Sequence, residues 1–291
     1  MKSRRLKPAK KQAKKPRLES EWQEDPGALL SATGEGLGNR FVVARAADLH
    51  ESGATPAALA RAVCGEVWDG LLVVGDIETT PVEPAATVPV IAAEIINRDG
   101  SPGGTCLNGL RVLAVLSGLP AGIFRMDQRE VSWRRVADEI ELMIAGQDVP
   151  QAARQPPSFE LLGHRARVVE FWNPHCVVEV DDPAQEDLMA FFRAASERSD
   201  LFPGGVNLEL VTRLQGGTLQ MRVCERGVGE TEACGSGAVA AALAIWSEGD
   251  RDAIEVQMPG GSLLLQPAPS GGLQLRGGAS VRHLPKESET A

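Results

Sequence analysis

Apolar residues along this chain fall mostly in short or alternating runs bounded by glycine, proline and asparagine, a pattern typical of β-strands. These runs predict strands at 41–44, 71–74, 88–96, 131–136, 140–144, 159–162, 168–171, 176–180, 206–212, 218–224, 254–258, 262–266 and 273–275. Longer segments of helical length and composition predict helices at 55–66, 110–116, 188–197 and 238–246.

The strands divide into two groups, and each group contains one strongly apolar helix. We therefore expect an α+β fold with two pseudo-symmetric domains, each a β-sheet wrapped around a central helix. The predicted N-terminal domain covers 31–128 together with a returning strand at 274–285, and the C-terminal domain covers 129–273, where the pattern turns strongly to strands. Residues 1–30 are predicted to be a disordered basic extension.

Charge is distributed unevenly along the chain. The net charge is -9, yet residues 1–17 contain nine basic residues and no acidic one. Such a tail could bind an anionic surface, but a solvated extension is the more common meaning, so nucleic-acid binding is not expected. The apolar runs are too short to span a membrane, and no secretory signal is visible. We expect a soluble cytoplasmic protein.

Lysine and cysteine usage limits the possible chemistry. Between Lys15 and Lys286 there is no lysine, so the folded body offers none for a Schiff base with pyridoxal phosphate. The odd number of cysteines, five, without a secretory signal argues against a disulfide framework, and the lack of a Cys-x-x-Cys pair argues against a structural zinc site. We expect an enzyme without cofactor or metal.

Two of the cysteines occur in matching contexts. Cys106-Leu107-Asn108-Gly109 and Cys234-Gly235-Ser236-Gly237 each lead into an apolar helix, which makes them an internal repeat. A helix N-terminus offers free N–H groups and a positive dipole end, which we expect to bind a carboxylate and to lower the thiol pKa values. Two such entrances could place one sulfur on each face of an α-carbon and invert it. Cys64, Cys176 and Cys224 are expected to be structural.

Several ordered motifs resemble the diaminopimelate epimerase family, over residues 34 to 284. They lie at 36–42, 97–101, 106–111, 173–177, 202–207, 225–237 and 259–263. The resemblance implies that Cys106 and Cys234 are the two acid/base residues and that His175 supports the site. It further implies that the substrate contacts are Asn39, Asn97, Leu107, Asn108, Asn173, Asn207, Glu225, Arg226, Gly235 and Ser236.

The chain departs from the family pattern at three positions. Leu107 and Trp172 stand where the family usually has glycine, and Arg40 replaces a usual aspartate. The resemblance favours epimerisation of LL-2,6-diaminopimelate to the meso form, in lysine and peptidoglycan-precursor biosynthesis. A racemase of the same architecture with another amino-acid substrate is one alternative, and a thiol redox or binding protein is another. The expected partner is a small amino acid, and a homodimer is possible.

Overall fold

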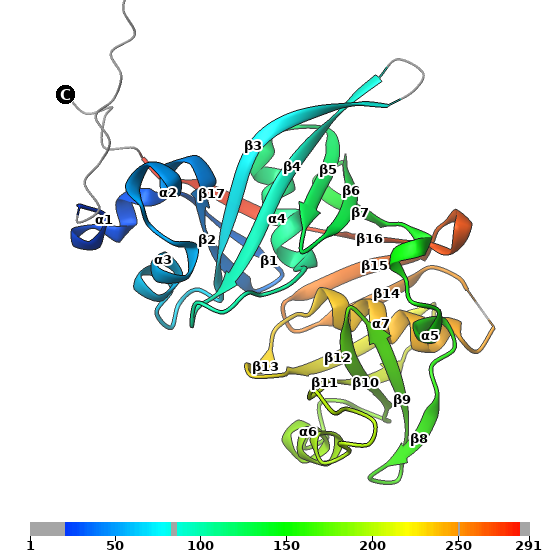
Figure 1. Ribbon diagram of the computed structural model, residues 1–291. Coiled ribbons are helices and arrows are strands. Elements are labelled where there is room, and N and C mark those ends of the chain that lie inside the picture. Colours follow the sequence, from blue (N-terminus) through cyan, green and yellow to red (C-terminus); the bar gives the residue numbers. More distant parts are fainter. Residues whose placement is uncertain (1–20, 83–85, 250, 286–291) are drawn as a thin grey trace, which may run out of the picture.

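The computed structural model describes residues 21–82, 86–249 and 251–285 (Figure 1). The first half contains α1 (Glu21–Glu24), η1 (Pro26–Leu29), β1 (Leu30–Gly36), β2 (Asn39–Arg45), α2 (Ala46–Ser52), α3 (Pro56–Val63), β3 (Gly70–Val82), β4 (Ala86–Asn97), α4 (Leu107–Ser117), β5 (Ala121–Met126), β6 (Arg129–Val136) and β7 (Glu139–Ile144). The connecting segment contains η2 (Gly146–Asp148) and α5 (Gln151–Arg154). The remaining elements are β8 (Ser158–Leu161), β9 (His164–Phe171), β10 (Asn173–Glu179), α6 (Leu188–Ser196), β11 (Asn207–Arg213), β12 (Thr218–Glu225), β13 (Gly229–Thr231), α7 (Gly235–Trp246), β14 (Ile254–Met258), β15 (Gly261–Pro267), η3 (Pro269–Gly271), β16 (Leu273–Gly277) and β17 (Ser280–His283).

Both halves pair their strands in the same sequence of directions. From β1 to β7, successive pairs are antiparallel, parallel, antiparallel, parallel, antiparallel and antiparallel. The series β9, β10, β11, β12, β14, β15 and β16 repeats this order. An outer strand completes each set, because β17 pairs with β1 and β8 pairs with β9 (Figure 1). The expected pseudo-symmetric α+β architecture is confirmed.

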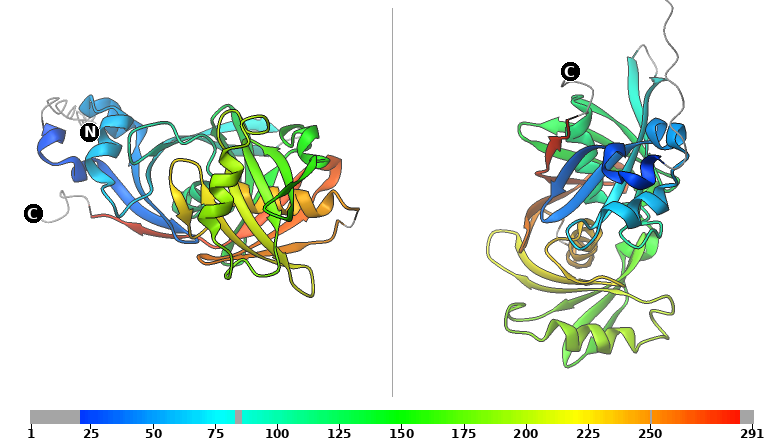
Figure 2. Two further views of the ribbon diagram at one scale, coloured as in Figure 1. Left: turned by 90° about the horizontal axis from the view of Figure 1, so that it is seen from below. Right: turned by 90° about the vertical axis from the view of Figure 1, so that its left-hand side faces the viewer.

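Each sheet curls around one helix, α4 in the first half and α7 in the second (Figures 1 and 2). Both helices occupy the same place in the repeat, between the strands of a parallel pair. Residues 107–114 of α4 are all buried, and so are residues 237–244 of α7. A helix that is apolar on every side needs such an enclosed position. The N-termini of the two helices are thereby fixed by the surrounding strands.

Glycines in β1 allow α4 to approach the sheet closely. A Cβ atom on Gly34 would lie 2.3 Å from Val112 Cγ1, and one on Gly36 would lie 2.9 Å from the Asn108 carbonyl oxygen. The strands expected from the sequence begin only at residue 41, whereas the structure has a strand at this glycine-rich stretch as well. The strand forms because the missing side chains make room for the helix.

The strand pairing divides the two halves later in the chain than the boundary predicted at residue 129. Strands β6 and β7 continue the sheet of the first half beyond β5 and contact α4. The segment 145–157 therefore connects the halves, which meet through the antiparallel pair of β7 with β16. Residues 21–30 also belong to the fold, since Trp22 and Leu29 are buried beneath α2 and α3. The rest of the predicted N-terminal extension lies outside the described residues.

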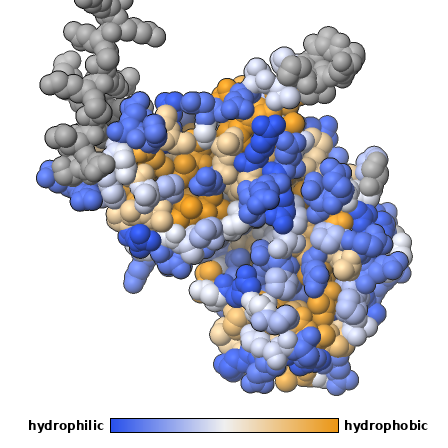
Figure 3. All heavy atoms as spheres, viewed as in Figure 1, coloured by the Kyte–Doolittle hydropathy of each residue, from blue (hydrophilic) through white to orange (hydrophobic). Residues whose placement is uncertain are grey.

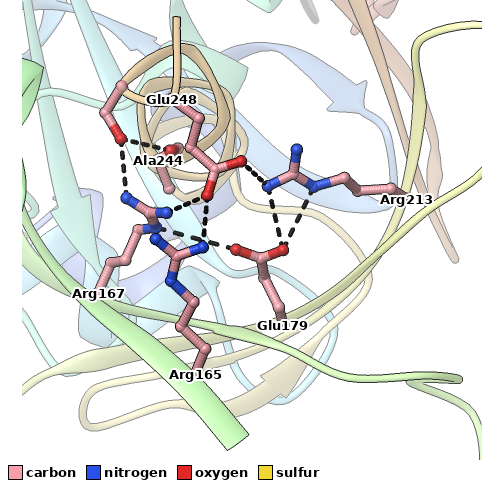
Figure 4. A network of polar contacts seen from close by, with 7 residues as sticks. Arg165, Arg167, Glu179, Arg213, Ala244 and Glu248 are labelled. Carbon is pink, nitrogen blue, oxygen red and sulfur yellow. Dashed lines mark hydrogen bonds and ion pairs between the residues drawn. The ribbon is translucent and has the colours of Figure 1, made fainter. Parts of the chain in front are cut away.

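A network of charged residues holds the C-terminal end of α7 (Figure 4). The Glu248 carboxylate forms ion pairs with Arg165 and Arg167 of β9 and with Arg213 of β11. The Arg167 guanidinium also donates to Ser247 Oγ, and Arg213 pairs with Glu179. Cations at a helix C-terminus interact favourably with its dipole. This network fixes the end of α7 that lies opposite Cys234.

Within the described ranges, no helix is long and apolar enough to span a membrane. On the face shown in Figure 3, apolar residues occur in several areas separated by hydrophilic ones. The exposed large apolar side chains lie on separate elements and include Ile77 on β3, Met189 on α6 and Val228. The homodimer expected from the sequence stays a prediction.

Candidate active site

The N-termini of α4 and α7 touch each other between the two halves. A Cβ atom on Gly235 would lie only 2.9 Å from Leu107 Cβ. The Asn108 side-chain amide donates to the Ala233 carbonyl at 3.2 Å and also to Asn39 Oδ1. The contacts of Leu107 with Gly235 and of Asn108 with Ala233 cross from one half to the other, so the two cysteine segments lie together.

An open pocket of about 730 Å³ lies at this junction, a size that suits a small-molecule ligand. It collects eleven of the residues singled out in the sequence, which are Asn39, Asn97, Cys106, Leu107, Asn108, Asn173, Glu225, Arg226, Cys234, Gly235 and Ser236. Both cysteines face the same pocket, and all five cysteines of the chain have free thiols. Cys106 and Cys234 therefore line one pocket as two free thiols.

Two further expected residues lie behind the pocket wall. Asn207 is 8% exposed, and its Oδ1 accepts a hydrogen bond from the Arg226 backbone N–H at 2.9 Å. His175 is fully buried, and its Nδ1 lies 2.7 Å from Glu209 Oε1. In the structure these two residues thus support the pocket from behind, whereas the sequence assigned Asn207 to direct substrate contact.

Carboxylates surround Cys234. Its thiol donates to Glu225 Oε2 at 3.3 Å, and Glu225 Oε1 accepts from the Thr231 hydroxyl at 2.6 Å. Glu209 approaches from below, because a Cβ on Gly237 would lie 2.7 Å from Glu209 Oε1. Burial raises the pKa of Cys234 well above its ordinary value, and the two carboxylates add to this rise.

The surroundings of Cys106 are different although the fold is repeated. Asn97 ends β4 where Glu225 ends β12, and Leu72 is the third residue of β3 where Glu209 is the third of β11. A Cβ on Gly109 would accordingly meet a Leu72 methyl at 2.7 Å. The apolar and amide side chains of the first half therefore replace the two carboxylates of the second.

A buried cation lies on the same helix as Cys106. Arg111 has no exposed surface, and its guanidinium donates to the carbonyl oxygens of Leu107 and Gly278 at 3.4 and 3.3 Å. Burial lowers the pKa of Arg111 to about 10. Glu225 raises the pKa of Cys106 and the Arg111 charge lowers it, whereas Cys234 has two carboxylates, Glu225 and Glu209, that both raise its pKa.

The sequence-based expectation of lowered thiol pKa values is wrong. The N–H groups of Gly109 and Gly237 do donate to the sulfurs of Cys106 and Cys234, at 3.3 and 3.4 Å. Burial outweighs these bonds and raises the pKa of Cys106 to about 11. The free-energy cost of desolvating a buried thiolate is larger than the stabilisation from one or two weak hydrogen bonds to sulfur. Two carboxylates, Glu225 and Glu209, raise the pKa of Cys234, whereas only Glu225 does so at Cys106.

Sequence reasoning also missed several residues of the site. Glu209 lies beside His175, and Thr231 orients Glu225. Arg98 lines the pocket, forms no hydrogen bond or ion pair with any other residue of the described ranges, and directly follows Asn97 as Arg226 follows Glu225. The internal repeat could have pointed to Arg98, because Arg226 stands at the same position in the second cysteine half.

Leu107 does not block the pocket. Its side chain is 2% exposed and packs into the core where α4 meets α7. In the parts of the chain that the structure describes, no three potential ligands from histidine, cysteine, aspartate or glutamate gather as a metal site would require.

The family model for diaminopimelate epimerase matches residues 168–281. The diaminopimelate epimerase of Rhodopseudomonas palustris (strain BisA53) is 33% identical over 254 residues, which cover 79% of this chain and 84% of that relative. The chain belongs to the diaminopimelate epimerase family. A second member, from Xylella fastidiosa (strain M12), is 34% identical over 261 residues, covering 82% of this chain and 88% of its own. The protein is therefore an isomerase of the amino-acid epimerase type.

Solved structures with low sequence identity share the fold. A phenazine biosynthesis PhzC/PhzF protein from Clostridium difficile aligns with a TM-score of 0.61 at 10% identity, over 87% of this chain and 97% of its own. A predicted epimerase from Pseudomonas aeruginosa aligns with a TM-score of 0.57 at 17% identity, over 88% and 98%. A hydroxyproline epimerase from Agrobacterium vitis aligns with a TM-score of 0.53 at 11% identity, over 87% and 91%. These likenesses establish the architecture.

Proposed function

We propose that this family member epimerises LL-2,6-diaminopimelate to the meso form, without a cofactor, in the cytoplasmic synthesis of lysine and peptidoglycan precursors. The observation that carries the proposal is the meeting of two cysteine-bearing helix N-termini in one pocket. The identity to diaminopimelate epimerases over most of the chain supports the substrate.

The helix N-termini would bind the carboxylate next to the reacting carbon. The first amides of α4 and α7, at Leu107, Asn108, Gly235 and Ser236, have no acceptors within their helices. When the α-proton leaves, negative charge passes into this carboxylate. Fixed N–H donors in a water-poor site stabilise that charge without reorganisation, which is the main difficulty of the reaction.

The unequal surroundings of the cysteines assign their roles. Cys106, beside the Arg111 cation, would hold the thiolate that removes the α-proton, with the C–H electron pair moving toward the carboxylate. Cys234, hydrogen-bonded to Glu225, would hold the thiol that delivers a proton to the opposite face. The carbon is then inverted, and the two sulfurs have exchanged protonation states. The reverse reaction uses them in the opposite order.

The far end of the substrate would be held at the pocket mouth. Arg226 lines the mouth, and its guanidinium donates to the Gly204 carbonyl, which fixes the side chain there. A planar guanidinium suits the bidentate binding of a second carboxylate. Asn39 and Asn173 line the same pocket and offer amide groups for the distal ammonium.

A second candidate is a racemase or epimerase for another amino acid. Arg98 favours it, because an additional cation without an internal partner, from the equivalent position of the other half, changes the charge of the mouth. The two candidates share the chemistry and differ in the substrate side chain.

The test is inversion in deuterium oxide. LL-diaminopimelate and a panel of other amino acids are incubated with the purified chain under reducing conditions, and α-deuterium and stereochemistry are followed by NMR and chiral chromatography. We expect inversion of diaminopimelate with one deuterium incorporated, and its loss in Cys106→Ala and Cys234→Ala. Turnover of a different amino acid alone would favour the second candidate. Normal inversion by either cysteine variant would rule out the two-base assignment.

A further inference from the structure

Trp172 adopts a backbone conformation that bulky residues rarely adopt. It is the single residue between the paired ends of β9 and β10, Phe171 and Asn173, and its φ is 58°. Left-handed backbone favours glycine, so a tryptophan there needs contacts that offset the strain.

Those contacts join the two halves of the molecule. The Trp172 ring stacks on Phe171 of its own half with ring centres 4.5 Å apart. Its indole N–H donates to the Asp148 carbonyl at 2.9 Å, in the connecting segment. The guanidinium of Arg129, from the first half, lies over the face of the Trp172 ring, with its Cζ 5.1 Å from the ring centre. A cation over an indole face is the strongest of the cation–π pairs.

Arg129 connects this ring to the segment that carries Cys106. Its guanidinium donates to the Thr105 hydroxyl at 3.4 Å and pairs with Asp127 at 2.7 Å. The Cys106 backbone N–H donates to the Met126 sulfur at 3.5 Å, in the same β5–β6 hairpin. The hairpin thus contacts the residues on both sides of the peptide bond that leads into Cys106.

The second cysteine segment is held in a comparable way by the opposite half. The β1–β2 turn lies against the β14–β15 turn, where a Cβ on Gly260 would lie 2.1 Å from the Leu37 carbonyl oxygen. The Gly260 N–H donates to the Glu232 carbonyl, two residues before Cys234. The segment of Cys234 is thus held by backbone packing, whereas the segment of Cys106 is held through the side chains of Trp172 and Arg129.

We infer that Trp172 and Arg129 are positioning residues, which hold Cys106 at the pocket through Thr105 and couple its placement to the opposite half. The inference rests on the proposed function only for its catalytic consequence. The placement of the sulfur itself can be measured without any substrate. Arg129 and Trp172 do not line the pocket, so a change at either one acts through Cys106.

The test compares alkylation of the two cysteines. Wild type, Arg129→Ala, Trp172→Gly and Trp172→Phe are treated with iodoacetamide at about pH 9, where some thiolate is present, and labelling at Cys106 and Cys234 is followed by peptide mass spectrometry. Arg198→Ala is a matched control, because Arg198 also lies 5.1 Å from an aromatic ring, that of Phe159, and also pairs with an aspartate at 2.7 Å.

We expect Cys106 to be alkylated about fivefold faster in Arg129→Ala and Trp172→Gly, as expected for loss of one cation–π contact. Cys234 should stay within about twofold of wild type by the same reasoning, since its segment is held separately. Trp172→Phe, which keeps an aromatic face, and Arg198→Ala should match the wild type. Equal acceleration of both cysteines, or no change at Cys106, would overturn the inference. A chain that inverts no amino acid but shows the expected labelling would refute the proposed function alone.

Discussion

The contact between Gly235 and Leu107 gives the sharpest prediction. In Gly235→Ala, the new Cβ would lie 2.9 Å from Leu107 Cβ and 3.1 Å from Asn108 Oδ1. Carbon atoms in good contact lie about 3.5–4.0 Å apart, so the two helix N-termini must separate by roughly 0.6–1 Å. Both cysteines sit at these N-termini and would move apart with them.

The expected effect is catalytic rather than global. A displacement of about 1 Å at a reacting group can cost roughly 100-fold in rate. Alanine is also a better helix former than glycine, which limits any loss of stability. We therefore expect kcat for inversion to fall about 100-fold while the melting temperature changes little. Initial rates of α-deuterium incorporation and thermal unfolding followed by circular dichroism measure the two quantities.

A second substitution checks the cause. Leu107→Gly removes the atom that the new Cβ would meet, so the double variant should recover part of the lost rate, with Asn108 still close. Gly278→Ala is the control, because a Cβ there would meet no atom within 4 Å. Full activity in Gly235→Ala, or a double variant no faster than the single one, would refute the reasoning.

Three further predictions concern titration, binding and stability. Burial raises the pKa of Cys64 and Cys106 to about 11. Near pH 9 the native state therefore keeps thiol protons that the unfolded chain loses. The unfolding free energy measured in urea should fall as pH rises from about 9 to 10. Arg98→Ala should raise KM for a dicarboxylic substrate about tenfold with unchanged kcat, as loss of one charged hydrogen bond predicts. Arg40→Ala removes the same charge outside the pocket and should leave KM unchanged. Equal KM values in both variants would contradict this. Glu248→Ala leaves three arginines without their shared partner and should lower the unfolding free energy by about 2 kcal/mol. This is less than the loss expected for breaking a fully buried ion pair, because Glu248 is partly exposed. A melting temperature within about 1 °C of wild type in scanning calorimetry would contradict the prediction.

The sequence by itself determined the parts of this protein that depend on neighbouring residues. The apolar segments that become α4 and α7 were recognisable because both are rich in leucine, valine and alanine over a helical length. The two cysteine segments were recognisable because each is a local repeat of cysteine and glycine before such a helix. Motif order then indicated the family, which the relatives confirm.

Only the tertiary structure decided what depends on residues distant in the chain. The pairing of β6 and β7 with β5 was not visible in the sequence, because these strands have the same apolar pattern whichever half they join. The thiol pKa values were predicted in the wrong direction because burial is a property of the assembled pocket. Glu209 and Arg111 sit far from each other in sequence, yet their charges distinguish two cysteines whose local sequences look alike. Electrostatic energy depends on distance and burial in three dimensions, and neither quantity is encoded in local spacing.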